Sequence, residues 1–385
     1  MLDTVILFIP KPNFQILKHE RFFPTTKFLG SSLDAYSKHV NNPTAADKQS
    51  GIYLPRLTVN KRGGQISLKV EFSVPKILYG NNLDEVDEAD FPKVVELLKT
   101  KLWHMGVAVS ASSLMAAEVS SFHPSKNIPL RGGYTSSFVI RELHKVNLTR
   151  KLDFDKVDFR NEGQSMQLYS VSHALVVYDK LVDLAKTESR AIDKDQTKGQ
   201  QSLLDLIAKK DPKTEILRIE IRLSKKAKMN QVLTKLGYKT NPTFQQIFKK
   251  DVCRKVLQDY WQSYLEPDSF LFDGISKVSS VFISIVGQNA KIKPKQALYL
   301  TGLNLVSKEF GLRQLRSMIE AMGHKKNWER IRKDCKLFKP EAVPKLPNDF
   351  VKIIKDTIAA MDCYKTGKQQ VNVKPQVHNP HLEYH

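Results

Sequence analysis

The sequence predicts an α+β protein with a largely antiparallel central sheet and flanking helices, followed by a helical C-terminal domain. Two observations lead to this fold class. Up to about residue 240, short runs that alternate apolar and polar residues are separated by turn signals and helical stretches. Beyond that point the pattern is helical, with a strong basic bias. A length of 385 residues suits two or three domains. We expect a region 1–240, divisible into 1–110 and 111–240, a helical domain over 241–340, and a proline-containing linker with a polar, flexible tail over 341–385.

The first strands are the easiest to justify. Val5–Ile9 is an aliphatic run that Pro10 stops, so it reads as a strand and not as a signal peptide. Residues 66–74 alternate aliphatic and polar side chains, and a glycine turn separates them from a hairpin partner at 55–60. The apolar spacing over 91–105 is helical.

The middle of the chain adds strands and short helices. Leu217–Leu223 has the cleanest pattern, with four aliphatic residues on one face and Arg218, Glu220 and Arg222 on the other. Such a charged row is either the solvated side of a sheet or part of a site. In this region we expect strands over 114–122, 165–169, 173–178 and 217–223, and helices over 138–146, 181–194 and 202–209.

Charge is the strongest global signal. Lys and Arg number 61 against 40 Asp and Glu, a net charge of +21, which attracts polyanions and makes nucleic acid the leading partner; a merely soluble basic protein is the alternative. Three scattered cysteines indicate neither a zinc site nor a disulfide framework and suit a reducing cytoplasm. No run reaches the about 18 apolar residues that span a bilayer. We therefore expect no membrane partner. The G-x-x-x-x-G-K-[ST] loop of nucleotide-binding proteins is absent as well, so we expect no nucleotide cofactor.

The segment from Ala174 to Lys180 carries the chemistry. In a strand, Tyr178 and Lys180 point to the same face because side chains alternate with a period of two. A tyrosine beside a fixed cation can attack a phosphodiester, since the lysine favours the phenolate and balances charge on the phosphate. This pair therefore suggests a DNA-nicking activity.

Two acids in expected strand interiors are candidate metal ligands. Glu118 and Glu220 would supply oxygen ligands, which Mg²⁺ or Mn²⁺ prefers. Arg218 and Arg222 flank Glu220 and could pair with it or grip DNA phosphates. His123 is a candidate third ligand or general base. Taken singly, each of these residues could instead be structural, as a partner in a salt bridge or a hydrogen bond.

The helical C-terminal domain ends in a basic segment. We expect helices over 295–307, 312–321 and 325–336, the last two joined by a short turn with Gly323, as in a helix-turn-helix. The last helix has only Trp328 and Ile331 for packing. Its cations are candidate DNA contacts, although a solvated lysine-rich face is the other interpretation: Lys325, Lys326, Arg330 and Arg332.

Four short motifs, in order along the chain, are similar to those of the filamentous-phage gene II/X family of phage and plasmid replication initiators. They are Met1–Asp3 before an aliphatic strand, Pro75–Asn82, Val177–Lys180 and Leu217–Arg222. The resemblance covers the chain to about residue 240. It implies a rolling-circle endonuclease fold and makes Tyr178 the DNA-linking nucleophile, with the two strand acids at Glu118 and Glu220. The His-hydrophobic-His pair of many rolling-circle endonucleases is absent, so the acidic metal site is inferred from strand position.

The resemblance implies initiation of rolling-circle replication in the cytoplasm of a bacterial host. The protein would nick origin DNA with a divalent metal, form a 5′-phosphotyrosine intermediate and later rejoin the strand. Its partners would be the origin DNA, single-stranded or supercoiled, and a host helicase and polymerase. Two alternatives stay open: a relaxase for plasmid mobilisation, which shares the chemistry, and a non-catalytic, sequence-specific DNA-binding regulator.

Overall fold

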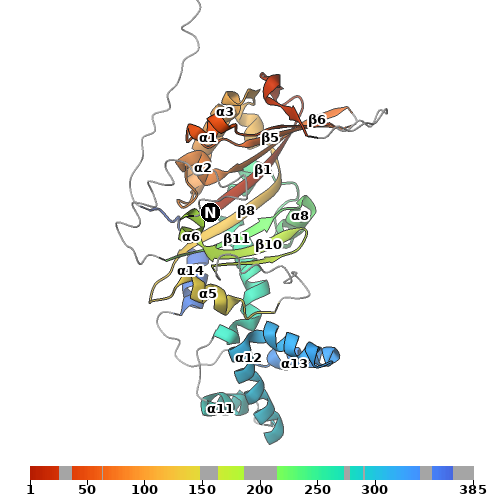
Figure 1. Cartoon of the computed structure of the whole chain (residues 1–385), viewed down its shortest axis with the longest axis vertical. Coiled ribbons are helices and arrows are strands. Elements are labelled where there is room, and N and C mark those ends of the chain that lie inside the picture. Colours follow the sequence, from red (N-terminus) through yellow and green to blue (C-terminus); the bar gives the residue numbers. More distant parts are fainter. Residues whose placement is uncertain are drawn as a thin grey trace, which may run out of the picture.

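A computed structural model describes residues 1–25, 37–62, 64–147, 164–185, 215–272, 278–288, 291–338 and 349–366. It confirms an α+β fold with a large antiparallel sheet, flanking helices and a helical C-terminal region (Figure 1). The expected helix over 202–209, and the second half of the one over 181–194, lie outside the described residues.

Nine of the described strands form one sheet, in the order β3-β4-β5-β6-β1-β8-β11-β10-β9, and every neighbouring pair is antiparallel. The first strand is therefore central, between β6 and β8. A two-stranded sheet pairs β2 with β7. The strands are β1 (Leu2–Pro10), β2 (Gln15–Ile16), β3 (Phe23–Pro24), β4 (Ser37–Asn41), β5 (Arg56–Arg62), β6 (Gln65–Ser73), β7 (Val107–Ala108), β8 (Glu118–Pro129), β9 (Ser165–Tyr169), β10 (His173–Asp179) and β11 (Ile216–Leu223).

The helices are α1 (Ala45–Gln49), α2 (Val74–Tyr79), α3 (Phe91–His104), α4 (Ala111–Met115), α5 (Ser136–Leu143), α6 (Lys180–Ala185), α8 (Lys226–Lys235), α9 (Phe244–Ile247), α10 (Lys250–Tyr260), α11 (Val278–Gln288), α12 (Pro294–Ala321), α13 (Lys325–Cys335) and α14 (Phe350–Ala360). Short helical segments are η1 (His19–Arg21), η2 (Glu88–Asp90), η3 (Trp261–Leu265) and η4 (Glu266–Phe272). In the part of the chain that the structure describes, no helix has both the length and the apolar content that crossing a bilayer requires.

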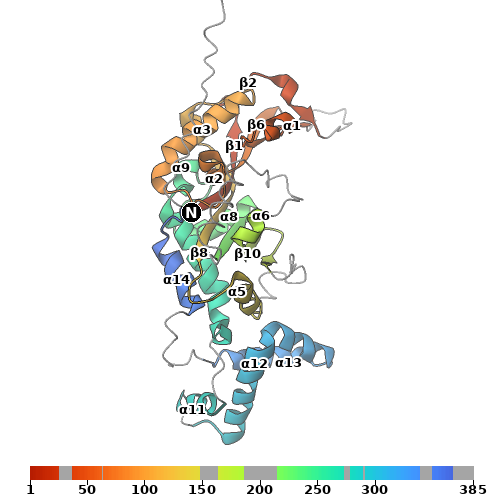
Figure 2. The same ribbon diagram turned by 60° about the vertical axis from the view of Figure 1, so that its left-hand side comes forward.

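The two faces of the sheet differ. On β10, Leu175 and Val177 join the main hydrophobic core, whereas Ala174, Val176 and Tyr178 form a separate small cluster. Because side chains alternate along a strand, these two sets lie on opposite faces. Helices α3, α9 and α14 lie along one side of the sheet, which we call the core face (Figure 2). We call the face with Tyr178 the open face.

The strand expected over 114–122 was placed too early. Residues 111–115 form helix α4, and β8 begins only at Glu118 and continues to Pro129. Ser110 explains the helix, because its hydroxyl accepts a hydrogen bond from the backbone N–H of Ser113 and caps the first turn. The other expected strands and the helix over 91–105 are confirmed within a few residues.

The sheet body also holds helices from beyond residue 240. Helix α10 buries Val252, Val256 and Leu257 in the main core and packs on β8 and β11. Helix α14 also buries residues in the main core and packs on β8 and α10, from within the 341–385 segment that we expected to be a linker and flexible tail. Its burial follows from an overlooked period, since apolar residues recur at Phe350, Ile354 and Ile358. The expected boundary at residue 240 therefore falls inside this packed body.

Between α10 and α14 the chain forms a helical projection. Helices α11 and the first half of α12 extend away from the sheet in both views (Figures 1 and 2). Gly311 bends α12, with φ of 80° and ψ of 155°. At this bend the Leu312 N–H donates to the Lys145 carbonyl at 2.9 Å, next to α5. A Cβ on Gly311 would lie 2.8 Å from the Lys145 Cα, so the contact requires glycine.

Candidate functional site

The predicted tyrosine and the charged row of β11 lie side by side on the open face. Tyr178 pairs with Arg218 across β10 and β11, and Val176 pairs with Glu220. Two of the three residues of the row are buried, with Arg218 1% and Glu220 3% exposed, whereas Arg222 is half-buried. The strand pattern thus brings these polar groups together, and burial distinguishes them from the ordinary outer side of a sheet.

Glu220 is the centre of this cluster. Its Oε1 accepts a hydrogen bond from Arg222 Nε at 2.8 Å and lies 3.5 Å from His123 Nδ1. Its Oε2 accepts a hydrogen bond from the Tyr178 hydroxyl at 3.3 Å. Burial acts to raise the pKa of Glu220, but Arg222, His123 and Arg218 together hold that pKa well below its usual range. Glu220 is therefore an ionised acceptor that orients the tyrosine.

Tyr178 is a neutral phenol in this environment. Burial raises the pKa of Tyr178 well above its ordinary value, Arg218 opposes this, and the Glu220 charge adds to the rise. We expected Lys180 to favour the phenolate, but its Nζ lies over the ring, 5.7 Å from the ring centre. The hydroxyl keeps its proton and donates it toward Glu220.

Lys180 is a buried ammonium without a hydrogen bond. It begins α6, directly after β10, and its side chain is fully buried. Its Nζ makes no hydrogen bond within the described chain, and its nearest charge partner is Asp183 Oδ2 at 3.9 Å. Burial, and to a smaller extent the Arg218 charge, lowers the pKa of Lys180 to about 7. An anion that entered beside Lys180 would supply the hydrogen-bond acceptor that its Nζ lacks in the described chain.

Arg218 is fixed by residues to which we assigned no role. Its Nη2 donates to Ser125 Oγ at 2.8 Å and lies 3.3 Å from Asp3 Oδ2. Its Nη1 donates to the Asn82 carbonyl at 2.8 Å. Asp3 and Asn82 belong to the motifs that carried the family resemblance, and their place in those motifs is the sequence signal that could have identified them. These contacts hold the guanidinium against β8 and β1 and keep it from solvent.

Glu118 does not join this cluster. It stands at the start of β8, paired with Phe8 of β1 and bridged to Thr243, and it forms an ion pair with Lys226. Glu220 is opposite Ser125, seven residues further along β8. At about 3.3 Å per residue the two acids are separated by roughly 23 Å along the strand. They do not meet at one ion.

The donor set beside Tyr178 is small. Among the described residues, no three His, Cys, Asp or Glu side chains gather as a metal-binding group. The pair available is Glu220 with His123, whose facing atoms are 3.5 Å apart. Mg²⁺ commonly takes only one or two protein ligands and completes its shell with substrate phosphate and water. The residues therefore fit an ion that arrives with the nucleic acid, in competition with Arg222 for the same carboxylate.

The predicted cations of α13 lie in the helical projection, apart from β10 (Figures 1 and 2). Lys326 and Arg330 are exposed, and Arg332 is half-buried. Trp328 is buried, as its role in packing requires. For Lys325 the structure describes only the backbone, at the start of α13.

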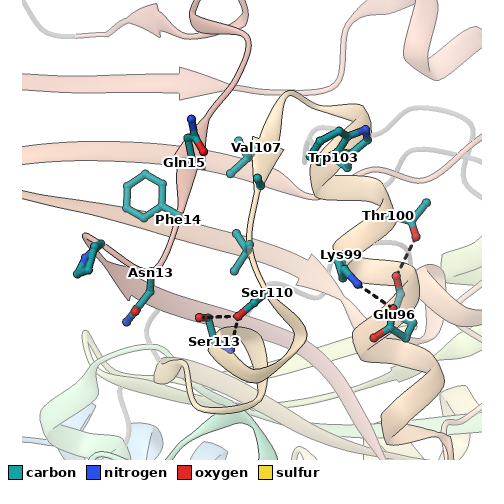
Figure 3. A pocket seen from close by; sticks show the side chains of 13 residues that line it. Asn13, Phe14, Gln15, Glu96, Lys99, Thr100, Trp103, Val107, Ser110 and Ser113 are labelled. Carbon is teal, nitrogen blue, oxygen red and sulfur yellow. Dashed lines mark hydrogen bonds and ion pairs between the residues drawn. The ribbon is translucent and has the colours of Figure 1, made fainter. Parts of the chain in front are cut away.

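Two hollows lie at the other end of the sheet. One, of about 630 Å³, is bordered by Phe14, Trp103 and Ser113 (Figure 3). The second, of about 440 Å³, shares Ser113 with it and includes Glu118. Neither contains Tyr178 or Glu220, so the chemical cluster does not lie in either hollow.

Comparison of the chain with protein-family models, with curated proteins and with solved structures finds no match. The geometry of the open face therefore carries the functional argument.

Proposed function

We propose that this protein initiates rolling-circle DNA replication as a nicking-joining endonuclease, with Tyr178 as the nucleophile. The observation that carries the proposal is the Tyr178 hydroxyl bonded to ionised Glu220, with Lys180 Nζ buried over the tyrosine ring and without a hydrogen bond in the described chain. Burying an acid, a tyrosine and a lysine on one strand pair destabilises the fold, so a function has to justify the arrangement. The large antiparallel sheet and the resemblance in four motifs support a rolling-circle endonuclease fold.

The nicking step uses groups that are already in place. The Tyr178 Oη, which its hydrogen bond to Glu220 orients, attacks phosphorus and loses its proton to solvent as the new bond forms. A Tyr Oη–P bond forms and the P–O3′ bond breaks, and the leaving 3′-oxygen takes a proton from solvent water to become a free 3′-hydroxyl. Lys180 and Arg218, whose charge acts on Tyr178, balance the negative charge on the phosphate.

Rejoining is the reverse displacement. A new 3′-hydroxyl attacks the phosphotyrosine, the P–Oη bond breaks, and Tyr178 recovers its proton. Because the phosphotyrosine keeps the energy of the phosphodiester, no nucleotide is consumed. Glu220 and His123 would hold a Mg²⁺ or Mn²⁺ ion, whose contribution when bound is to polarise the scissile phosphate. A host helicase would separate the strands, and a polymerase would extend the 3′-end.

The test is incubation of the full-length protein with supercoiled DNA that carries its own origin, with Mg²⁺ or with EDTA. We expect relaxed circles with protein attached to the 5′-end, only when metal is present. Tyr178→Phe should remove the adduct and lower nicking by at least about 1,000-fold while DNA binding persists.

Tyr169→Phe is the matched control. Tyr169 packs on the same small cluster from β9, and its variant also loses one hydroxyl, but Tyr169 lies opposite Ala174 whereas Glu220 lies opposite Val176. It should nick normally. An adduct that survives Tyr178→Phe would reject Tyr178 as the nucleophile, and the absence of any adduct would favour the non-catalytic regulator.

A further inference from the structure

The open face continues from the Tyr178 cluster onto the other half of the sheet, where β1, β6 and β5 follow β8 (Figure 1). Strand pairing there places five residues side by side, one each on β1, β6, β5, β4 and β3: Phe8, Lys69, Thr58, Val40 and Phe23. Directly paired residues share one face of an antiparallel sheet. Phe8 stands between Leu7 and Ile9, which join the main core, so the five residues lie on the open face. We call them the cross-strand row.

Each end of the cross-strand row presents an aromatic ring to solvent. Phe8 is 38% exposed and Phe23 is 62% exposed. Phe8 also borders the hollow of about 440 Å³, which leaves space beside the ring for a planar group. The two rings are four strand intervals apart, which at about 4.8 Å per interval is roughly 19 Å. Exposed rings at a fixed spacing on a sheet are a surface on which the bases of a single strand can stack.

The charge around the cross-strand row suits a phosphate backbone. On β4, β5 and β6 the open face carries four cations and one acid: Lys38, Arg56, Arg62, Lys69 and Glu71. The Glu71 carboxylate is already paired with Lys69 Nζ at 3.0 Å. Glu118, opposite Phe8 on β8, forms its ion pair with Lys226. This surface is therefore net positive, and its two acids are already neutralised.

We propose that this half of the open face binds single-stranded DNA, with bases stacked on Phe8 and Phe23 and phosphates held by the cations between them. The proposal rests on the proposed function for the identity of the strand, and it adds a path for that strand to Tyr178. Phe8 is opposite Glu118, so it lies roughly 23 Å along the sheet from Glu220, a distance that several nucleotides can bridge. A duplex is a poorer occupant, because its bases stack on one another and their faces are closed to the rings.

The experiment is fluorescence anisotropy with a labelled poly-dT oligonucleotide of about 16 nucleotides. Binding is measured in EDTA with full-length protein that carries Tyr178→Phe, so the result does not depend on nicking. Phe8→Ala and Phe23→Ala should each weaken binding by at least about fivefold, with the salt dependence unchanged because stacking is not electrostatic. Phe8→Tyr keeps the ring and should bind like the parent. Lys69→Gln should instead reduce the slope of log K against log salt by about 0.7.

Phe310→Ala is the matched control. Phe310 is 37% exposed and lies on α12 in the helical projection, so this variant loses the same ring from the same degree of exposure. It should bind like the parent. Equal losses in Phe8→Ala and Phe310→Ala, full binding by the Phe8 and Phe23 variants, or a preference for duplex of the same length would overturn the proposal. If the ring variants lose binding while wild type forms no phosphotyrosine adduct, the strand surface is supported and the nicking activity is rejected.

Discussion

An ammonium group that is fully buried without a hydrogen bond destabilises a folded protein, and Lys180 is such a group in the described chain. The Asp183 carboxylate, 3.9 Å away and partly exposed, offsets only part of the lost hydration. In the free protein this lysine therefore lowers the stability of the fold. We infer that its function is to bind an anion.

Replacing the ammonium should separate stability from activity. We expect Lys180→Met to raise the free energy of unfolding by about 1–3 kcal/mol, because the methionine fills the same space without a charge. The variant should nick at least about tenfold more slowly. Urea denaturation and the nicking assay measure the two effects, with exposed Lys352→Met as the control. A variant that is both less stable and fully active would contradict the assignment.

The gain from Lys180→Met should depend on pH. The pKa of Lys180 is lowered to about 7 in the folded protein, against an ordinary value of 10.5. Between these values the unfolded chain binds a proton that the folded protein does not, so this group makes stability rise with pH across that window. The difference in free energy of unfolding between Lys180→Met and wild type should be largest below pH 7 and should shrink toward pH 10. Unfolding curves at pH 6 and pH 9 would show it, and an advantage that grows with pH would refute it.

At the scale of elements, the bend of α12 depends on one backbone conformation. Gly311→Ala should lower the stability of the helical projection by about 1–3 kcal/mol, because alanine is strained at φ of 80° and its Cβ meets Lys145. Hydrogen exchange of α12 and α13 measures the loss. Gly287→Ala on α11 is the control, since its Cβ enters open space and alanine favours the helix. Equal protection in the two variants would mean that the contact does not hold the projection.

Period and turn signals in the sequence were enough to predict most elements, and they failed where local capping or long-range packing decides. The β5–β6 hairpin and β10 with β11 were predictable because apolar alternation and turns are local. The start of β8 was not, because Ser110 caps a helix in an otherwise strand-like run. Register also explains why the prediction that Glu118 lies near Glu220 failed. The position of Glu118 relative to β11 depends on how β8 pairs with its neighbours, and spacing in the sequence does not fix register between distant strands.

At the scale of the whole molecule, the charge of +21 governs how the protein meets DNA. Each phosphate neutralised by a lysine or arginine releases counterions, so affinity falls with salt in proportion to the number of contacts. Replacing the four α13 cations with glutamine should weaken duplex binding and reduce the slope of log K against log salt by about 0.9 for each lost contact. Fluorescence anisotropy at several salt concentrations measures the slope. The replaced residues are Lys325, Lys326, Arg330 and Arg332.

A second variant with the same net charge tests whether position matters. It replaces four exposed lysines of the sheet body: Lys93, Lys99, Lys239 and Lys352. If both variants change the slope equally, binding is general attraction to a basic surface, and α13 is not a specific contact.

The return of the chain to the sheet body after α13 has a mechanical consequence. Glu85 accepts a hydrogen bond from the Tyr364 N–H at 2.9 Å and donates its own N–H to the Tyr364 carbonyl at the same distance, so the segment after α14 is fastened to the first half of the chain. The projection of α11, α12 and α13 is thus an insertion anchored at both ends, by α10 before it and α14 behind it. A single proteolytic cut, whether before α11 or after α13, would leave the projection attached by its other end. Attachment at both ends also limits how far the projection can move relative to Tyr178.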